Sequence, residues 1–423
     1  MANGLRDKRT SIIPAMVIFG FLYLNCSMYA VEVFSTPVKA AGSFVLIMIL
    51  LVSKRHVVLT QKRNLNHVFL CAGALFLLSV ISMLINTPNT NNDIPTLISL
   101  FEAVCLCLIL QRDEFETAYI NAVVAISIIA LVSFSLLFVA PSVLQLFPLR
   151  LWHTTITFRD LGFAAVADAQ YLRNNGMFYE PGQMAFYLNL AIAFWFMRKG
   201  NEKKWKVVLI CVAVISTLST AGLICAILLV LGYSAVGYRR GKLSLRGFKA
   251  PRIIFLCILV TAGFAAFYLI APENFDYFVR KFSEIDFSNS GITEGTGSGF
   301  ERWRAVLIAL NAISTNPIFG IGGMGIGQYG LQNMISTAAF LNWFGLYGFV
   351  YGLICCIAYF AFYVSSAKGG LSKVLVFLGV LAMLGTQAVE GDIFVFIQIL
   401  YSAEVVIPRM LGIKVPRDKR CLT

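Results

Sequence analysis

A succession of long apolar runs, separated by short polar segments, is the feature that most restricts the fold of this chain. A helix crosses a bilayer with roughly 17 to 25 mostly apolar residues. About twelve runs approach or reach this length, and they cover residues 12–31, 37–53, 66–85, 94–110, 117–140, 181–197, 205–218, 219–237, 252–271, 337–364, 373–389 and 392–411. We therefore predict an all-α polytopic membrane protein with about twelve transmembrane helices.

Composition supports this fold class. Hydrophobic residues make up 58% of the 423 residues and charged residues only 13%, whereas soluble domains carry roughly 25% charge. The net charge of +13 would suit nucleic acid, but Lys and Arg gather in alternate short segments, as the positive-inside bias requires. The ten cysteines show no zinc-site spacing. We expect no nucleic-acid partner, no metal and no cofactor.

The distribution of basic residues predicts the topology. The short segments 31–36, 86–93 and 390–391 carry no Lys or Arg, whereas both ends of the chain and the alternate connections are basic. This pattern places both termini on the cytoplasmic side. We treat residues 1–423 as one integral membrane domain with two long outer loops, 141–180 and 272–336.

These two loops hold almost all of the outer cationic side chains. Long loops are usually functional or disordered. They are also less bound by the charge bias, so chance placement is the alternative for any single residue. Because the planar guanidinium fork suits phosphate, the set predicts an anionic ligand. Its members are Arg150, Arg159, Arg173, Arg280, Lys281, Arg302 and Arg304.

Residues 173–188 in the first loop, RNNGMFYEPGQMAFYL, combine polar groups with the start of an apolar run. Pro181 predicts a helix start there. Glu180 is then either a helix-start residue stabilised by the dipole or an acid/base group at the water interface. The amides of Asn175 and Gln183 suit sugar contacts, although Asn-Asn-Gly fits a turn equally well.

The second loop contains a helix start and a glycine-rich segment. Ser298 and Glu301 fit a capping box, which puts Arg302 in the first helical turn, where cations are disfavoured. This conflict favours an anionic partner for Arg302 or Arg304; surface anchoring by Trp and Arg is the alternative. Residues 316–330 mimic a dinucleotide fingerprint, but no strand precedes them. We interpret them as a flexible re-entrant or lid-like loop.

Acidic side chains in or near the apolar runs are few: Glu32, Glu102, Glu390, Asp392 and Glu404. A proton relay would need several that face one pathway. The scarcity weakens the alternative of a coupled transporter.

Four motifs follow one another between residues 150 and 365. They are Arg173 with the Gly176–Gly182 segment, the Ser216–Thr220 turn, Arg302-Trp303 with Asn316–Gly322, and Phe340–Gly348 at the opening of the next run. In this order, and with the twelve-run layout, they resemble the O-antigen polymerase and O-antigen ligase superfamily of bacterial envelope glycosyltransferases.

This resemblance implies a GT-C-like helical fold in the bacterial inner membrane, with the long loops in the periplasm. It implies an O-antigen, or related surface polysaccharide, polymerase that joins repeats linked to undecaprenyl diphosphate, without nucleotide sugar or metal. Arg173 and Glu180 match the polymerase-like Glu-Pro segment, and Arg302 or Arg304 matches the arginine of the large loop. The expected partners are the lipid-linked oligosaccharide and membrane lipid; the sequence does not decide whether a polysaccharide chain-length regulator also binds.

The expected catalytic residues are Glu180, Arg173, Arg302 and Arg304, and the expected substrate-binding residues are Arg159, Asn175, Tyr179, Gln183, Arg280 and Trp303. Two departures from the family favour a polymerase over a ligase. Ala221 and Gly222 follow the Ser/Thr turn where the family often has Arg, and Ser336 and Thr337 stand where ligases often carry His. An O-antigen ligase, a polysaccharide flippase or transporter, and a non-enzymatic assembly protein are the alternatives.

Overall fold

The computed structural model describes residues 2–60, 65–86, 90–152, 156–167, 173–198, 202–234, 268, 298–322, 338–385 and 387–410. In these ranges the chain is mostly helical, with fifteen helices and one small sheet. The chain divides into two compact units. Unit 1 comprises Met1–Ser53, Asp113–Arg304 and Ala367–Gln387, and unit 2 comprises Lys54–Arg112, Ala305–Ser366 and Ala388–Thr423.

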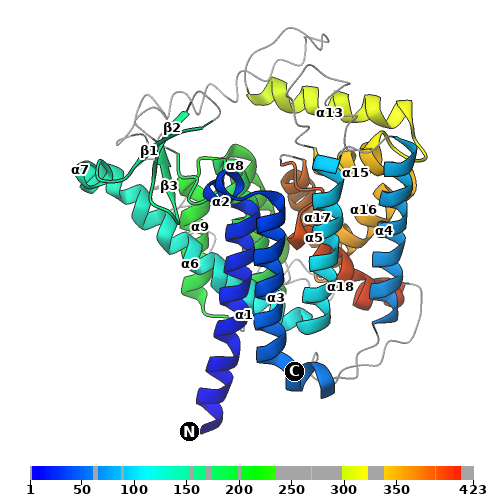
Figure 1. Cartoon of the computed structure of the whole chain (residues 1–423), viewed down its shortest axis with the longest axis horizontal. Helices are drawn as coiled ribbons and strands as arrows, with labels where there is room; N and C mark the ends of the chain where they lie inside the picture. The colour runs from blue at the N-terminus through cyan, green and yellow to red at the C-terminus, as the bar shows by residue number, and fades with distance from the viewer. Residues whose placement is uncertain are drawn as a thin grey trace. The chain divides into compact units, whose positions relative to one another are not determined.

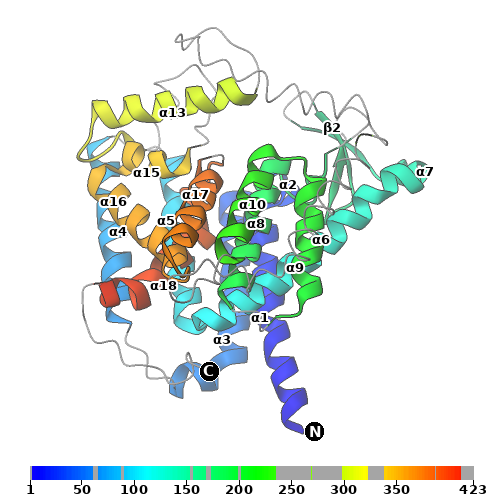
Figure 2. The same cartoon turned by 180° about the vertical axis from the view of Figure 1, so that it is seen from behind.

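Unit 1 is built around the helix that follows the Glu-Pro-Gly segment. Its helices are α1 (Ala2–Cys26), α2 (Met28–Val33), most of α3 (Thr36–Thr60), α6 (Arg112–Val139), α7 (Pro141–Leu144), α8 (Pro181–Met197), α9 (Lys204–Ser216), α10 (Thr220–Ser234) and α17 (Gly370–Leu384) (Figure 1). Every residue of α8 from 184 to 194 is buried. Helices α9 and α10 pack on α8, and α17 packs on α10 (Figure 2). Helices α9 and α10 are joined by the short connection 217–219 and contact each other.

A three-stranded antiparallel sheet lies in the first long loop, where no strand was expected. Its strands are β1 (Leu149–Trp152), β2 (Ile156–Asp160) and β3 (Ala165–Ala167), in the order β1-β2-β3. The register pairs Arg150 with Phe158 and Arg159 with Val166. The all-α expectation is wrong for this loop, because strands of three to five residues are too short to show a clear alternation.

The first predicted span, 12–31, is interrupted. Helix α1 ends at Cys26, and the Ser27 hydroxyl accepts a hydrogen bond from the Ala30 N–H at 3.1 Å, which caps the short helix α2. The Met28 N–H donates to the Met177 carbonyl at 2.8 Å, and Ser27 forms a bridge with Phe178. The break therefore ties α2 to the segment just before α8.

Unit 2 is built around α18, the last described helix. Its helices are α4 (Asn66–Ile85), α5 (Thr90–Ile109), most of α13 (Ser298–Thr315), α15 (Ala339–Tyr347), α16 (Phe349–Val364) and α18 (Ile393–Met410). Helix α18 packs on α4, α5 and α16. Its Gln398 is buried but hydrogen-bonded to the Tyr363 hydroxyl and, at 2.8 Å, to the Phe394 carbonyl. A polar residue in this run is thus satisfied internally.

The predicted span 337–364 is also two helices, which meet at Gly348 (φ 88°). The Phe349 N–H donates to the Pro317 carbonyl, and the Ile321 N–H donates to the Gly345 carbonyl, both at 2.8 Å. Residues 316–322 are thus hydrogen-bonded to the α15–α16 junction, and a re-entrant or lid-like role for 316–330 stays a prediction. Residues 323–330 lie outside the described ranges.

Three described helices are long and apolar enough to cross a membrane: Thr36–Arg55, Asn66–Ile85 and Arg112–Val139. Several shorter apolar helices accompany them, among them Thr220–Ser234 and Phe349–Val364. This is consistent with a membrane-embedded protein. The run 252–271 lies almost wholly outside the described residues, and twelve crossings remain a prediction.

Candidate functional site

The start of α8 places Glu180 at a helix N-terminus, where both explanations of this residue stay open. Glu180 occupies the N-cap position, yet its side chain makes no capping hydrogen bond and is exposed. Gln183 instead accepts a hydrogen bond from the Tyr179 N–H at 3.3 Å. Gln183, expected to bind substrate, thus stabilises the helix start. Glu180 itself is exposed to solvent.

The two asparagines upstream form a turn. The Asn174 Oδ1 accepts from the Gly176 N–H at 2.9 Å, and the Asn175 Nδ2 donates to the Phe178 carbonyl at 3.0 Å. Gly176 has a φ of 54°, which glycine adopts without strain. Both asparagines are buried. These bonds support the turn interpretation over direct sugar contact for Asn175.

Arg173 is engaged with the connection between α9 and α10. Its Nε donates to the Thr217 carbonyl at 3.2 Å and its Nη2 to the Leu218 carbonyl at 3.3 Å. Leu218 has a φ of 49°, which is uncommon for a residue with a side chain. The guanidinium therefore holds together a tight turn at the C-terminus of α9. Its expected catalytic role stays a prediction beside this structural one.

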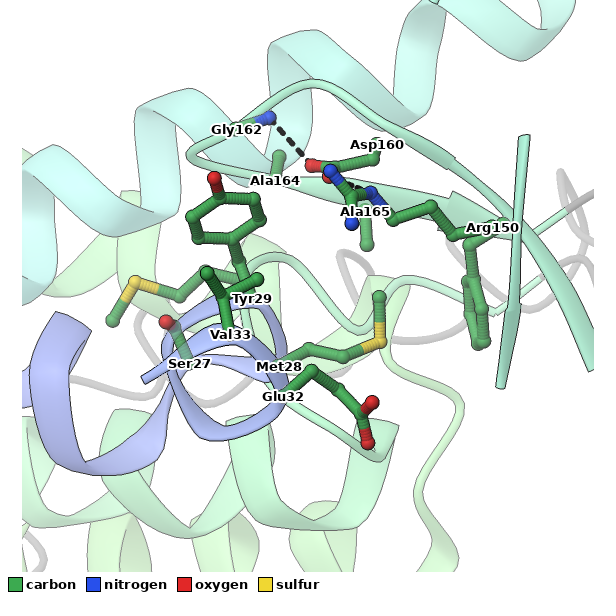
Figure 3. A pocket seen from close by; sticks show the side chains of 12 residues that line it. Ser27, Met28, Tyr29, Glu32, Val33, Arg150, Asp160, Gly162, Ala164 and Ala165 are labelled. Atoms are coloured by element: carbon green, nitrogen blue, oxygen red, sulfur yellow. Dashed lines mark hydrogen bonds and ion pairs between the residues drawn. The ribbon is translucent and has the colours of Figure 1, made fainter. Parts of the chain in front are cut away.

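An open pocket lies between α2, the sheet and the segment that leads to α8 (Figure 3). Polar side chains of Glu32, Arg150 and Asp160 line it together with apolar groups of Met28, Phe158 and Met177. Its volume is about 220 Å³, below the roughly 300–1,000 Å³ of typical pockets for drug-sized ligands. We call this cavity the α2–sheet pocket.

Arg150 and Asp160 form an ordered ion pair in this pocket. The Arg150 Nε lies 2.6 Å from the Asp160 Oδ2, and the Asp160 Oδ1 accepts from the Gly162 N–H at 2.8 Å (Figure 3). The guanidinium also lies over the Tyr29 ring, 5.3 Å from its centroid. Asp160 is buried, whereas the Arg150 side chain is half exposed. The pair fixes the direction in which the remaining N–H groups of Arg150 point.

Tyr179 links the pocket to the predicted segment. It packs on a buried cluster of Met28, Phe158 and Ala165, all of which line the pocket. Burial, and secondarily the nearby Glu32 carboxylate, raise the pKa of Tyr179 above its ordinary value. Its phenol therefore stays neutral at physiological pH. Glu180 follows Tyr179 directly, but it is absent from the lining of the pocket.

Sequence reasoning missed the lining residues of this pocket as a group. Glu32 was visible as an acid at the end of the first apolar run, but only the break at Ser27 brings it beside residues 177–179. Arg150 and Asp160 meet because β1 and β2 pair. Residues 149–152 (LRLW) alternate apolar and polar side chains weakly, and this was the available signal.

The arginines of the two loops differ in their surroundings. Arg159 lies in β2, and its Nη1 donates to the Phe147 carbonyl at 3.2 Å. The predicted helix start at Ser298 is confirmed, since α13 begins there. On α13, Trp303 is 45% exposed and Arg304 only 7%. Arg302 lies in α13 but its side chain is not described, and Arg280 lies outside the described residues.

Arg304 is a buried arginine with two unpaired nitrogen atoms among the described residues. Its Nε and Nη2 atoms have no hydrogen-bond acceptor in the described part of the chain. A buried, unsatisfied guanidinium is costly, which is the condition that an anionic ligand would relieve. The sequence placed arginines near the start of this helix, where cations are disfavoured. The unpaired nitrogen atoms of Arg304 are a structural observation in favour of the same anionic partner.

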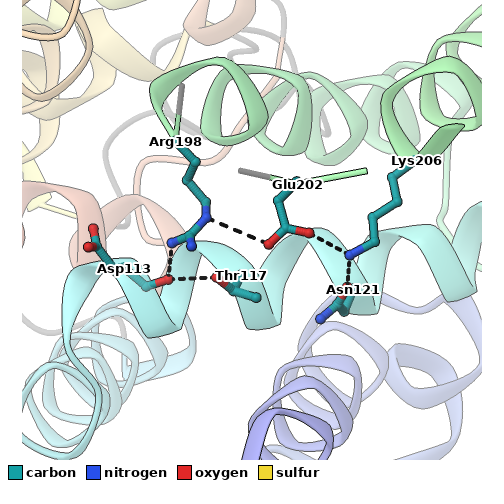
Figure 4. Close-up of polar contacts among 6 residues, drawn as sticks. All are labelled: Asp113, Thr117, Asn121, Arg198, Glu202 and Lys206. Atoms are coloured by element: carbon teal, nitrogen blue, oxygen red, sulfur yellow. Dashed lines mark hydrogen bonds and ion pairs between the residues drawn. The ribbon is translucent and has the colours of Figure 1, made fainter. Parts of the chain in front are cut away.

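The basic connection between α8 and α9 shows the opposite situation. Glu202 lies 3.7 Å from the Arg198 Nε and 2.6 Å from the Lys206 Nζ (Figure 4). Lys206 also donates to Asn121 on α6, and Arg198 donates to the Asp113 carbonyl. These cations are paired within unit 1, so they have less need of an external anion than Arg304 has.

No protein-family model matches the chain, and a search of curated proteins found no match. The assignment of a function therefore rests on the residues and their geometry.

Proposed function

We propose that this protein is a polysaccharide polymerase of the bacterial inner membrane. It would join undecaprenyl-diphosphate-linked repeat units of an O-antigen or a related surface polysaccharide at the periplasmic face. The proposal includes about twelve transmembrane helices in a GT-C-like arrangement, with both termini in the cytoplasm. No cofactor is required.

The observation that carries the proposal is the α2–sheet pocket beside the start of α8. Carboxylates, a fixed arginine and an aromatic ring line one small open cavity. Such a mixture of acceptors, donors and apolar surface suits a hydroxylated ring. The exposed Glu180 follows the segment that borders this pocket, and Arg304 offers a buried cation whose Nε and Nη2 have no acceptor among the described residues.

In the proposed reaction a hydroxyl oxygen of the acceptor sugar attacks the anomeric carbon of the donor. The bond from that carbon to the diphosphate oxygen breaks, and the diphosphate departs with the electron pair. Glu180 takes or orients the proton of the attacking hydroxyl. Arg302 and Arg304 bind the diphosphate and stabilise its developing charge. Arg173, by holding the α9–α10 turn, positions the segment that contains Glu180.

The lipopolysaccharide ladder of a deletion strain tests this proposal. A polymerase deletion leaves a single repeat on the lipid core. A ligase deletion leaves no repeat on the core while polymer persists on the lipid carrier, and a flippase deletion stops outward translocation. A capsular or other surface polysaccharide shortened to single repeats would equally support polymerisation.

Complementation of that strain tests the residue roles. Glu180→Gln should shorten the chain-length distribution, because an amide does not accept the hydroxyl proton. Arg304→Ala should reduce polymer by at least roughly tenfold if it removes a charged hydrogen bond to the leaving group. Normal polymer length in Glu180→Gln would exclude the base role, and normal length in both Arg302→Ala and Arg304→Ala would exclude the diphosphate clamp.

A further inference from the structure

The α2–sheet pocket has chemistry that selects among ligands. Its charged groups are Glu32, Asp160 and Arg150. Arg150 and Asp160 form an ion pair at 2.6 Å, so their charges cancel. The remaining charged group is Glu32, and the lining therefore has a net negative charge. A negatively charged lining repels phosphate and carboxylate groups. The pocket is therefore suited neither to the diphosphate of a lipid carrier nor to an acidic sugar.

The apolar part of the lining suits one face of a sugar ring. Met28, Phe158 and Ala165 form a buried cluster beneath the pocket, on which Tyr179 packs. A pyranose carries C–H groups on its ring faces and hydroxyl groups around its edge. Carbon-lined surface on one side and a few fixed polar groups on the other are the usual features of a small-molecule site.

The polar groups supply complementary hydrogen bonds. Glu32 is exposed and, when ionised, accepts hydrogen bonds from hydroxyl groups. Arg150 has five N–H donors; its Nε faces Asp160, and the structure records no side-chain or carbonyl acceptor for the others among the described residues, so they can donate to ring or hydroxyl oxygens. The Asp160 ion pair and the Tyr29 ring hold this guanidinium in place. The orientation of the donor is thus set before any ligand binds.

We propose that the α2–sheet pocket binds one uncharged sugar ring, with Glu32 accepting from its hydroxyls and Arg150 donating to its oxygens. This inference rests on the proposed function and deepens it, since it makes the pocket the subsite for a neutral residue of the repeat unit. The volume of about 220 Å³ admits a single ring. Glu32, rather than Glu180, is then the carboxylate in contact with this sugar.

The test uses the purified full-length protein in detergent. Saturation-transfer NMR measures the binding of neutral monosaccharides (glucose, galactose and N-acetylglucosamine) against glucuronic acid, which has the same ring with a carboxylate. We expect at least one neutral sugar to bind with a dissociation constant in the millimolar range, and glucuronic acid at least roughly tenfold more weakly.

Variants locate the binding. Glu32→Gln and Arg150→Gln should each weaken the neutral sugar by roughly tenfold, the effect of losing a hydrogen bond to a charged group. Asp113→Asn is the matched control, because it removes an exposed carboxylate of the same unit outside the pocket. Circular dichroism confirms that each variant is folded. Arg150→Lys keeps the charge and tests the fork geometry if Arg150→Gln fails to fold.

The outcomes separate this inference from the proposed function. No saturable binding of any neutral sugar, equal binding of glucuronic acid, or unchanged binding in Glu32→Gln would overturn the pocket assignment, whatever the deletion strain shows. Pocket-dependent sugar binding together with normal polymer in the deletion strain would support the pocket and reject the polymerase.

Discussion

Among single residues, Arg304 and Arg198 differ in burial and in the contacts of their guanidinium groups. Arg304 is buried, and its Nε and Nη2 atoms have no hydrogen-bond partners in the described ranges. Arg198 also has an Nε without a hydrogen-bond partner in those ranges, but this atom lies 3.7 Å from Glu202, and the Nη1 donates to the Asp113 carbonyl. A buried charge without a partner destabilises the fold, whereas a paired one loses a favourable contact when it is removed. The two arginines should therefore respond differently to the same substitution.

Arg304→Met should leave the apparent melting temperature of the ligand-free protein unchanged or higher, and it should abolish polymer formation in cells. Arg198→Met should lower the melting temperature, because Glu202 and the Asp113 carbonyl lose a partner. Intrinsic fluorescence during heating in detergent measures both. A clear loss of stability in Arg304→Met would indicate that the arginine serves the fold rather than a ligand.

Glu390 gives a pH dependence of stability. It lies between α17 and α18, its Oε2 is buried without a hydrogen-bond partner in the described ranges, and burial raises the pKa of Glu390 from 4.5 to about 7. The folded protein therefore keeps a proton that the unfolded chain loses above pH 4.5. The unfolding free energy should fall as pH rises from 4.5 to 7, by up to about 3 kcal/mol.

Glu390→Gln should remove this contribution, because an amide does not titrate. The variant should melt at a higher temperature than the parent at pH 8. Its melting temperature should also change less between about pH 5 and pH 7, roughly the range between the unfolded and folded pKa values of Glu390. Melting curves at several pH values in one buffer series measure the difference. Parallel profiles for the two proteins would mean that Glu390 titrates near its ordinary pKa.

The sequence indicated which residue types matter but not their contacts. Glu180 was equally compatible with capping and chemistry, and only the Gln183 hydrogen bond to Tyr179 shows which side chain completes the helix start. Arg173 was assigned to a ligand because a loop arginine has no visible partner in a sequence. Its partners are backbone carbonyls more than forty positions away. Long-range contacts of this kind follow from packing and not from local pattern.

Among the secondary-structure elements, the length of the apolar runs predicted the helices. It did not predict the breaks within two of these runs or the three short strands. In a membrane, a run of roughly 17 to 25 apolar residues has few possible structures other than a helix. Helices α4, α6 and α8 accordingly begin close to the predicted positions. The interruptions at Ser27 and Gly348 depend on contacts with residues 177–178 and 317–318. Each break brings a distant segment to the end of a helix, and the first of them creates the α2–sheet pocket.

Close packing of α10 on α8 at Gly222 gives a prediction. A Cβ added to Gly222 would lie 2.4 Å from the Ala185 Cβ. Gly222→Ala should destabilise the protein by about 1–3 kcal/mol through overpacking. Gly73→Ala is the matched control, since nothing lies within 4 Å of its added Cβ and alanine favours helix. Equal melting temperatures in the two variants would contradict the contact.

At the scale of the whole molecule, the strongest test of the membrane arrangement is the helix α6. It has 28 residues and is therefore about 42 Å long, more than the roughly 30 Å thickness of the hydrocarbon core. Asp113 at its first turn and Leu146 beyond its last are both exposed. If the basic segments face the cytoplasm, these two positions lie on opposite sides of the membrane, with Leu146 and the sheet outside.

Cysteines introduced at these positions report the side directly. A membrane-impermeant maleimide should label Leu146→Cys in cells whose outer membrane alone is permeable, and it should label Asp113→Cys only after the inner membrane is opened. The parent chain is the control, because its described cysteines are buried or partly buried. If Asp113→Cys were labelled before Leu146→Cys, the topology would be the inverse of the predicted one. The α2–sheet pocket would then lie on the cytoplasmic side. A polymerase that acts on periplasmic lipid-linked repeats would then be excluded, whereas a pocket for a neutral sugar would remain compatible with the same residues.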